Sequence, residues 1–91
     1  MANKIKCSHI LVKTKELAED VLRRIKAGED FKKIAEAESK CSSRRRGGNL
    51  GEFGRGRMVR EFEKAAFALE KGELSEPVKT EFGWHIIKRT G

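Results

Sequence analysis

No segment of this sequence approaches the roughly 18 consecutive apolar residues that a membrane-spanning helix needs. The opening residues, Met-Ala-Asn-Lys, are not followed by the apolar core of a secretory signal peptide. Only two cysteines are present, too few for the disulfide framework of a small secreted domain. These absences predict a cytoplasmic protein in which both thiols are reduced.

The usual motifs for nucleotide binding and for a serine nucleophile are also missing. Gly51 and Gly56 have the spacing of a phosphate-binding P-loop, but Arg57 and Met58 follow where lysine and serine or threonine are needed. No glycine triplet has the dinucleotide-binding spacing, and no serine lies in a nucleophile elbow. We therefore expect no cofactor.

Four side chains could ligate a metal ion through a sulfur or an imidazole nitrogen: Cys7, His9, Cys41 and His85. Structural zinc sites usually draw their ligands from closely spaced pairs, and only Cys7 and His9 are close together. We expect no metal site. Cys41 precedes a run of arginines, and a thiol close to positive side chains can be reactive. A covalent cysteine hydrolase is therefore one alternative, and a half-buried residue that ends a helix is the other.

The chain of 91 residues is long enough for one domain, residues 1–91, with a modest core. Charged residues make up 38% of it, and the formal net charge is +7. This surplus favours an acidic partner, such as nucleic acid, an anionic membrane or an acidic peptide. A basic binding module for nucleic acid or membrane is thus an alternative function, although Phe53 alone could stack with bases in the most basic loop. Nothing indicates more than a monomer.

Hydrophobic periodicity predicts the element order β, α, α, short β, α, β, β. The predicted strands cover residues 4–13, 50–53, a segment from 78, and 84–90, and the predicted helices cover 14–27, 30–39 and 59–72. Gly28 is a typical helix stop and Asp30 a typical N-cap. The helix pair between the first two strands leaves room for a crossover, so this pattern alone favours a small mixed sheet with helices on its faces.

The inner faces of the helices follow from the same periodicity. A stripe of Leu17, Val21 and Ile25 is expected to face the core from the first helix. In the second helix the inward residues are Phe31, Ile34 and Ala35, and in the third they are Phe62, Ala66 and Leu69.

The only two histidines lie in apolar strands at opposite ends of the chain. Alternation places His9 on the same face of its strand as Ile5, Cys7 and Leu11. If the first and last strands are neighbours, His9 and His85 can face each other, and two neutral imidazoles can satisfy one another by donating and accepting one hydrogen bond. The pair is then a polar staple between strands, the floor of a cleft, or both.

Apolar side chains near the glycine-rich loop and the last turn could form the walls of such a cleft. The segment EFGW, residues 81–84, indicates a tight turn or a bulge. Alternation would put Phe82 and His85 on opposite faces, and a bulge at Gly83 would bring them to one side. The candidate wall residues are Leu50, Met58, Phe62 and Phe82.

Three segments resemble the parvulin family of peptidyl-prolyl cis/trans isomerases. They are CSHILVK, similar to the family's first strand, CSSRRRGGNLGEFGRGRMVREFEKAAFAL, similar to its central loop and helix, and GELSEPVKTEFGWHIIKRT, similar to its final hairpin. The resemblance implies an α+β fold, a four-stranded antiparallel sheet surrounded by about four helices, of the FKBP-like superfold. It also implies an isomerase that accelerates rotation about X-Pro bonds without a covalent step and assists protein folding.

The resemblance further assigns the site residues. His9 and His85 would be the paired histidines of the active-site floor, Cys41 would face the isomerising bond, and Thr80 would join the polar network. The proline ring would be held by Leu50, Met58, Phe62 and Phe82. The implied partners are proline-containing peptides and protein clients, with no cofactor and no metal.

One difference from the phosphate-directed parvulins bears on the expected substrate preference. Those members carry a long basic loop between the first strand and the first helix, whereas here only Thr14 and Lys15 separate the two. The preference for phosphoserine or phosphothreonine before proline is therefore not transferred. The run Arg44, Arg45 and Arg46 is either a solvated basic loop or a substrate rim that favours an acidic residue before the proline.

Overall fold

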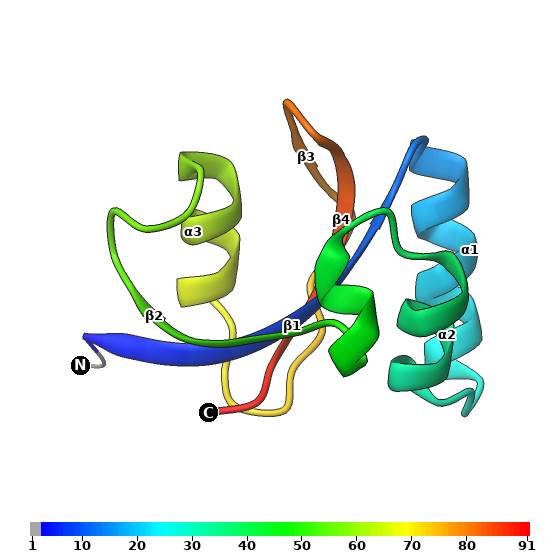
Figure 1. The fold of residues 1–91 in the computed structure, drawn as a ribbon, viewed down its shortest axis with the longest axis horizontal. Helices are drawn as coiled ribbons and strands as arrows, with labels where there is room; N and C mark the ends of the chain where they lie inside the picture. The colour runs from blue at the N-terminus through cyan, green and yellow to red at the C-terminus, as the bar shows by residue number, and fades with distance from the viewer. Residues whose placement is uncertain (1–2) are drawn as a thin grey trace.

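The computed structural model describes residues 3–91 and is built around one four-stranded sheet with the order β2-β1-β4-β3 (Figure 1). The strands are β1 (Lys4–Val12), β2 (Asn49–Gly54), β3 (Val78–Thr80) and β4 (Gly83–Arg89). Three α-helices, α1 (Lys15–Lys26), α2 (Phe31–Glu38) and α3 (Arg60–Phe67), accompany a 3-10 helix, η1 (Ser42–Arg46). The first and last strands are neighbours, as the histidine argument requires.

Every strand pair in the sheet is antiparallel, so the α+β antiparallel fold is confirmed and the mixed sheet expected from the crossover argument is wrong. After α1 and α2 the chain turns back through η1, and β2 runs antiparallel along the outer edge of β1. The helix pair therefore connects two antiparallel strands along one face of the sheet, and it is not the crossover of a parallel strand pair.

The two faces of the sheet carry separate helices and separate cores. Ile10 and Val12 point from β1 to the side covered by α1 and α2, and Ile5 and Cys7 point to the side of α3. Figure 1 shows α3 on one side of the sheet and the α1–α2 pair on the other. The alternation in β1 therefore decides which residues face α3, and His9 is among them.

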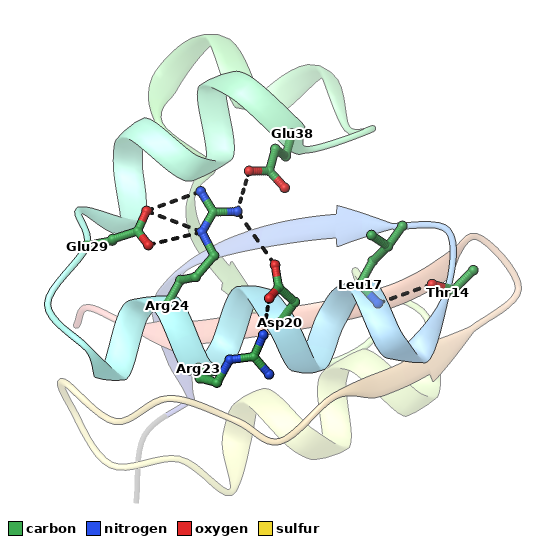
Figure 2. A network of polar contacts seen from close by, with 7 residues as sticks. All are labelled: Thr14, Leu17, Asp20, Arg23, Arg24, Glu29 and Glu38. Atoms are coloured by element: carbon green, nitrogen blue, oxygen red, sulfur yellow. Dashed lines mark hydrogen bonds and ion pairs between the residues drawn. The ribbon is translucent and has the colours of Figure 1, made fainter.

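Helix α1 begins where predicted but is rotated relative to the predicted stripe. The Thr14 hydroxyl accepts a hydrogen bond of 3.1 Å from the Leu17 N–H and caps the helix (Figure 2). Leu17 itself is 47% exposed, whereas Ala18, Val21 and Leu22 are buried. The buried stripe of α1 therefore runs through Ala18, Val21 and Leu22, and Leu17 lies outside it.

Helices α1 and α2 are joined by the guanidinium group of Arg24 (Figure 2). It donates to the Glu29 carboxylate, with an Nε to Oε2 distance of 3.1 Å, and to Glu38 on α2. Asp20, one turn earlier, lies 3.9 Å from the same group and pairs with Arg23. One arginine on α1 therefore links this helix to the α1–α2 connection and to α2.

Helix α3 is shorter than predicted and ends at Phe67, although Leu69 is still buried. The chain then folds back on the sheet, where the Gly72 N–H donates to the Arg89 carbonyl at 2.6 Å. Phe62, Ala66 and Leu69 all lie in the predicted core stripe. No helix within residues 3–91 has the length and apolar character that a bilayer span requires.

The backbone at Gly48 touches the strand that carries His9. The His9 N–H donates to the Gly48 carbonyl at 2.9 Å. Gly48 has a φ of +86°, and a Cβ there would lie only 2.4 Å from the His9 carbonyl oxygen. Only glycine allows this approach, which places the end of the Cys41–Gly48 segment against the centre of the sheet.

Candidate active site

His9 on β1 and His85 on β4 form a buried pair across adjacent strands. In the strand register His85 is opposite Leu11, so the two histidines are diagonal neighbours on one face. Their Nδ1 atoms are 2.9 Å apart, and their ring centroids are separated by 5.1 Å. At that distance one Nδ1 donates a hydrogen bond and the other accepts it.

Thr80 extends this pair into a chain of hydrogen bonds. Its Oγ1 lies 2.7 Å from His85 Nε2 and also accepts the Phe82 N–H at 3.2 Å. At the other end, His9 Nε2 is buried and has no hydrogen-bond partner within residues 3–91. Two tautomer arrangements satisfy the chain, and they differ in whether His9 Nε2 carries a proton.

Both imidazoles are neutral at neutral pH. Burial and, to a smaller extent, the proximity of His85 lower the pKa of His9 to about 4. Burial likewise lowers the pKa of His85 to about 4. Removal from water disfavours the imidazolium form of each ring, so the pair supplies polarity to its surroundings without net charge.

A pocket of about 500 Å³ opens above the histidine pair. The Phe62 ring stands edge-on to both imidazoles, with centroid distances of 5.4 Å to His9 and 5.3 Å to His85. An apolar cavity with few polar groups is the usual form of a small-ligand site. The lining residues are His9, Leu11, Cys41, Leu50, Arg57, Met58, Val59, Phe62, Phe82 and His85.

Most of the predicted site residues meet in this pocket. The exceptions are Thr80, which lies behind His85 and does not line the cavity, and the arginine run. Arg44 and Arg45 line an adjoining hollow of about 430 Å³ that shares Cys41 with the pocket. Arg46 is exposed and lines neither cavity.

Of the tight turn and the bulge that the segment EFGW allows, the structure has the tight turn. Thr80 pairs directly with Gly83, so Glu81 and Phe82 form a two-residue turn between β3 and β4. A Cβ on Gly83, which has a φ of +138°, would lie 2.6 Å from the Val12 carbonyl oxygen. Phe82 is outside the strand and is not bound by its alternation. Its side chain reaches the pocket from the rim, where it is 65% exposed.

Three lining residues were not predicted: Leu11, Arg57 and Val59. Leu11 was detectable, because it shares a strand face with His9. Arg57 and Val59 flank Met58 in an irregular segment, where no periodicity indicates the direction of a side chain. Cys7, by contrast, belongs to the core beside α3, where burial raises its thiol pKa to about 11.

Within residues 3–91 no three histidine, cysteine or acidic side chains come together as a metal site.

Comparison with known families matches residues 8–91 to the rotamase family, described as the PPIC-type PPIase domain. Foldase protein PrsA of Geobacillus kaustophilus is 52% identical over 88 residues, which are 96% of this chain and 31% of that protein.

Two solved structures show the same fold. PrsA from Bacillus subtilis superposes with a TM-score of 0.95 at 50% identity, covering 98% of this chain and 35% of the other. NmPin, the parvulin of Nitrosopumilus maritimus, has a TM-score of 0.90 at 53% identity, covering 100% of this chain and 99% of the other. The chain thus spans about a third of the length of the PrsA relatives and nearly all of NmPin.

Proposed function

Since the chain belongs to the PPIC-type peptidyl-prolyl isomerase family, we propose that it accelerates cis/trans exchange of X-Pro bonds in peptides and in flexible or unfolded protein segments. The parvulin prediction from sequence is confirmed at the level of family and fold. The observation that carries the proposed mechanism is the apolar pocket above two neutral, hydrogen-bonded histidines. The PrsA relatives are named foldases, which supports unfolded protein chains as clients.

Cis/trans exchange of an X-Pro bond requires no covalent chemistry from the protein. Rotation about a peptide bond has a barrier of roughly 18–20 kcal/mol because of amide resonance, and X-Pro bonds exchange over tens to hundreds of seconds without a catalyst. No bond is made or broken, so neither a nucleophile nor a leaving group is involved. Acceleration requires only that the twisted amide be bound better than either planar form.

The pocket walls provide the binding part of this task. Met58 and Phe62 of the pocket, together with Leu50, offer an apolar surface to the proline ring. Holding the ring there removes water from the adjoining imide. Because the charge-separated resonance form of the amide needs solvation, this removal weakens the partial double bond and favours rotation.

The polar end of the pocket receives the rotating carbonyl group. Cys41 lines the pocket from one side and the histidine pair forms its floor. Thr80 holds His85 in place through the 2.7 Å contact, and His85 in turn holds His9. We assign an organising role to this chain, which sets the polarity met by the carbonyl oxygen as it leaves the amide plane.

Two-dimensional NMR exchange spectroscopy on an Ala-Pro peptide tests the proposal directly, because it observes cis/trans exchange without a coupling protease. We expect catalytic amounts of the protein to increase the exchange rate. A folded protein that leaves the rate at its uncatalysed value would overturn the proposal.

We further propose that the arginine run favours an acidic residue before the proline. Cys41 is common to the pocket and to the neighbouring hollow that Arg44 and Arg45 line, so a peptide residue that passes Cys41 enters a region of positive charge. Coulomb attraction there acts on a carboxylate and is weakened by salt. Glu-Pro peptides should exchange faster than Lys-Pro peptides at low salt, and the ratio should fall at high salt. Equal rates under both conditions would refute this preference.

A further inference from the structure

We infer that Arg57 is a specificity-determining residue that makes the site favour an acidic residue immediately after the proline. The inference rests on the isomerase function proposed above. Arg57 is exposed and lines the mouth of the pocket, where every other lining side chain is apolar, a thiol or a neutral imidazole. Within residues 3–91 it is therefore the one permanent charge that lines this pocket.

The segment that carries Arg57 is held against α3 by contacts with Glu63 and Phe67. One oxygen of Glu63 accepts the Gly56 N–H, and the other lies 3.9 Å from Arg55 Nη1. The Arg55 guanidinium also lies 4.2 Å from the centroid of the Phe67 ring. The segment just before Arg57 is thus anchored on α3, so the backbone of Arg57 is held beside the pocket.

The charge of Arg57 is not used within the fold. Among residues 3–91, no carboxylate lies within 4 Å of its guanidinium group, and its side chain makes no hydrogen bond. Arg55, two residues earlier, has both an acidic and an aromatic partner. An uncommitted arginine next to a ligand pocket is well suited to bind a carboxylate on the ligand.

The side of the proline that Arg57 meets follows from the peptide direction proposed above, in which the residue before proline passes Cys41. In Figure 1 the β2–α3 connection and the α2–η1 connection lie on opposite sides of the β3–β4 hairpin. The first connection carries Arg57 and the second carries Cys41. A chain whose proline occupies the pocket leaves it in two directions. If the residue before proline passes Cys41, the residue after proline passes Arg57.

The expected size of the rate preference follows from the exposure of Arg57 to solvent. Ion pairs between solvent-accessible groups change an equilibrium or a rate by about two- to fivefold, and salt screens them. We therefore expect a preference of about that size for glutamate over alanine after proline, with a disfavour of similar size for lysine.

Exchange spectroscopy on three peptides, Ala-Pro-Ala, Ala-Pro-Glu and Ala-Pro-Lys, tests the inference with the wild-type protein and with Arg57→Gln, Arg57→Glu and Arg60→Gln. Arg60 has the same charge and lies three residues away, but it lines a different hollow on α3. We expect the glutamate-to-alanine rate ratio to exceed one in the wild type and in Arg60→Gln, to approach one in Arg57→Gln, and to fall below one in Arg57→Glu. Thermal melts verify that each variant is folded.

Two outcomes would overturn the inference while the isomerase function stands. In the first, all three peptides are accelerated but the wild-type glutamate-to-alanine rate ratio is one. In the second, this ratio exceeds one and has the same value in the wild type and in Arg57→Gln. A folded wild-type protein that accelerates none of the peptides would overturn the proposed function itself, and the inference with it. Persistence of the wild-type ratio in 0.5 M salt, a concentration at which the Debye length is about 4 Å, would refute the electrostatic origin of the preference.

Discussion

His9 and His85 are 76 residues apart in the sequence and connect strands β1 and β4 through one hydrogen bond. This bond can form only while both rings are neutral or share one proton. Burial makes the fully protonated pair unfavourable. The histidine pair is therefore both a structural connection across the centre of the sheet and the polar floor of the pocket.

The pair makes stability depend on pH. In the unfolded chain each histidine titrates near 6.5, whereas in the folded chain each has a pKa of about 4. Between these values the unfolded state binds more protons, so the free energy of unfolding falls as the pH is lowered from about 6.5 toward 4. The slope approaches about 1.4 kcal/mol per pH unit for each histidine. Urea unfolding at pH 7, 6 and 5 measures it.

The matched control is His9→Asn, which removes one titrating ring of the pair. We expect a shallower slope in this variant over the same pH range. A wild-type free energy of unfolding that is constant from pH 7 to pH 5 would contradict the lowered pKa values.

Cys41 separates a covalent from a non-covalent mechanism. Replacement by serine keeps a small polar group at the same place in the pocket but removes the thiol nucleophile. Because rotation about the imide needs no covalent bond, we expect Cys41→Ser to retain activity, with a loss of about tenfold or less in kcat/KM. Complete loss in a folded Cys41→Ser protein, measured by exchange spectroscopy, would support covalent catalysis instead.

Individual side chains were predictable where regular geometry governs them. Strand alternation correctly placed His9 and Cys7 on one face of β1, and the structure shows that α3 covers this face. Alternation does not place Phe82, because this residue lies in the turn between β3 and β4. Helical spacing predicted that Leu17 would face the core, which is wrong, since spacing alone does not decide between adjacent stripes of a helix. Arg57 was not foreseen, because its position depends on how an irregular loop is anchored.

At the scale of secondary-structure elements, the contact between the loop at Gly48 and strand β1 positions the strand that carries His9. Gly48→Ala would place a Cβ 2.4 Å from the His9 carbonyl oxygen at a φ of +86°. We expect a loss of about 2–4 kcal/mol in the free energy of unfolding, measured by urea titration, from combined strain and overpacking.

Gly51→Ala is the matched control for this substitution. Gly51 has a φ of +74°, but a Cβ there would have nothing within 4 Å. Its loss should be about 1–2 kcal/mol, since only the backbone conformation is strained. Equal losses at the two positions would show that the close approach to His9 does not matter.

The α1–α2 pair depends on Arg24 more than on its neighbour. Arg24 contacts carboxylates of the α1–α2 connection and of α2. Arg23 is 73% exposed at its side chain, and among residues 3–91 it pairs only with Asp20. Arg24→Gln should lower the melting temperature by a few degrees, and Arg23→Gln should lower it less. Thermal melts at low and high salt measure both variants. Identical melting temperatures for the two would show that the network in Figure 2 contributes no stability.

The elements themselves could be predicted to different degrees. The start of α2 could be predicted from the capping chemistry of Asp30, which does cap the helix. The start of α1 was predicted from hydrophobic periodicity, and the structure adds the Thr14 cap. Helix α3 ended before the predicted boundary because tertiary hydrogen bonds near Gly72 draw the chain back to the sheet. The 3-10 helix η1 was missed, since its arginines and serines carry no hydrophobic period.

At the scale of the whole molecule, the strand order β2-β1-β4-β3 assembles the site. It makes the first and last long strands neighbours, so that residues from both ends of the sequence share one pocket floor. Long-range pairing of this kind could be predicted only from the resemblance to a known family, because the local pattern alone favoured a mixed sheet. The cytoplasmic location and the monomeric state stay predictions.

The central claim is that an apolar pocket above neutral histidines lowers the barrier to rotation of an X-Pro bond. Exchange spectroscopy on Ala-Pro-Ala with the wild-type protein and with Met58→Ala, both verified as folded, tests it most directly. We predict clear acceleration by the wild type and a loss of about tenfold or more in Met58→Ala, since the truncation removes a partly buried apolar wall. Exchange at the uncatalysed rate with wild-type protein, or an undiminished rate with Met58→Ala, would contradict the claim.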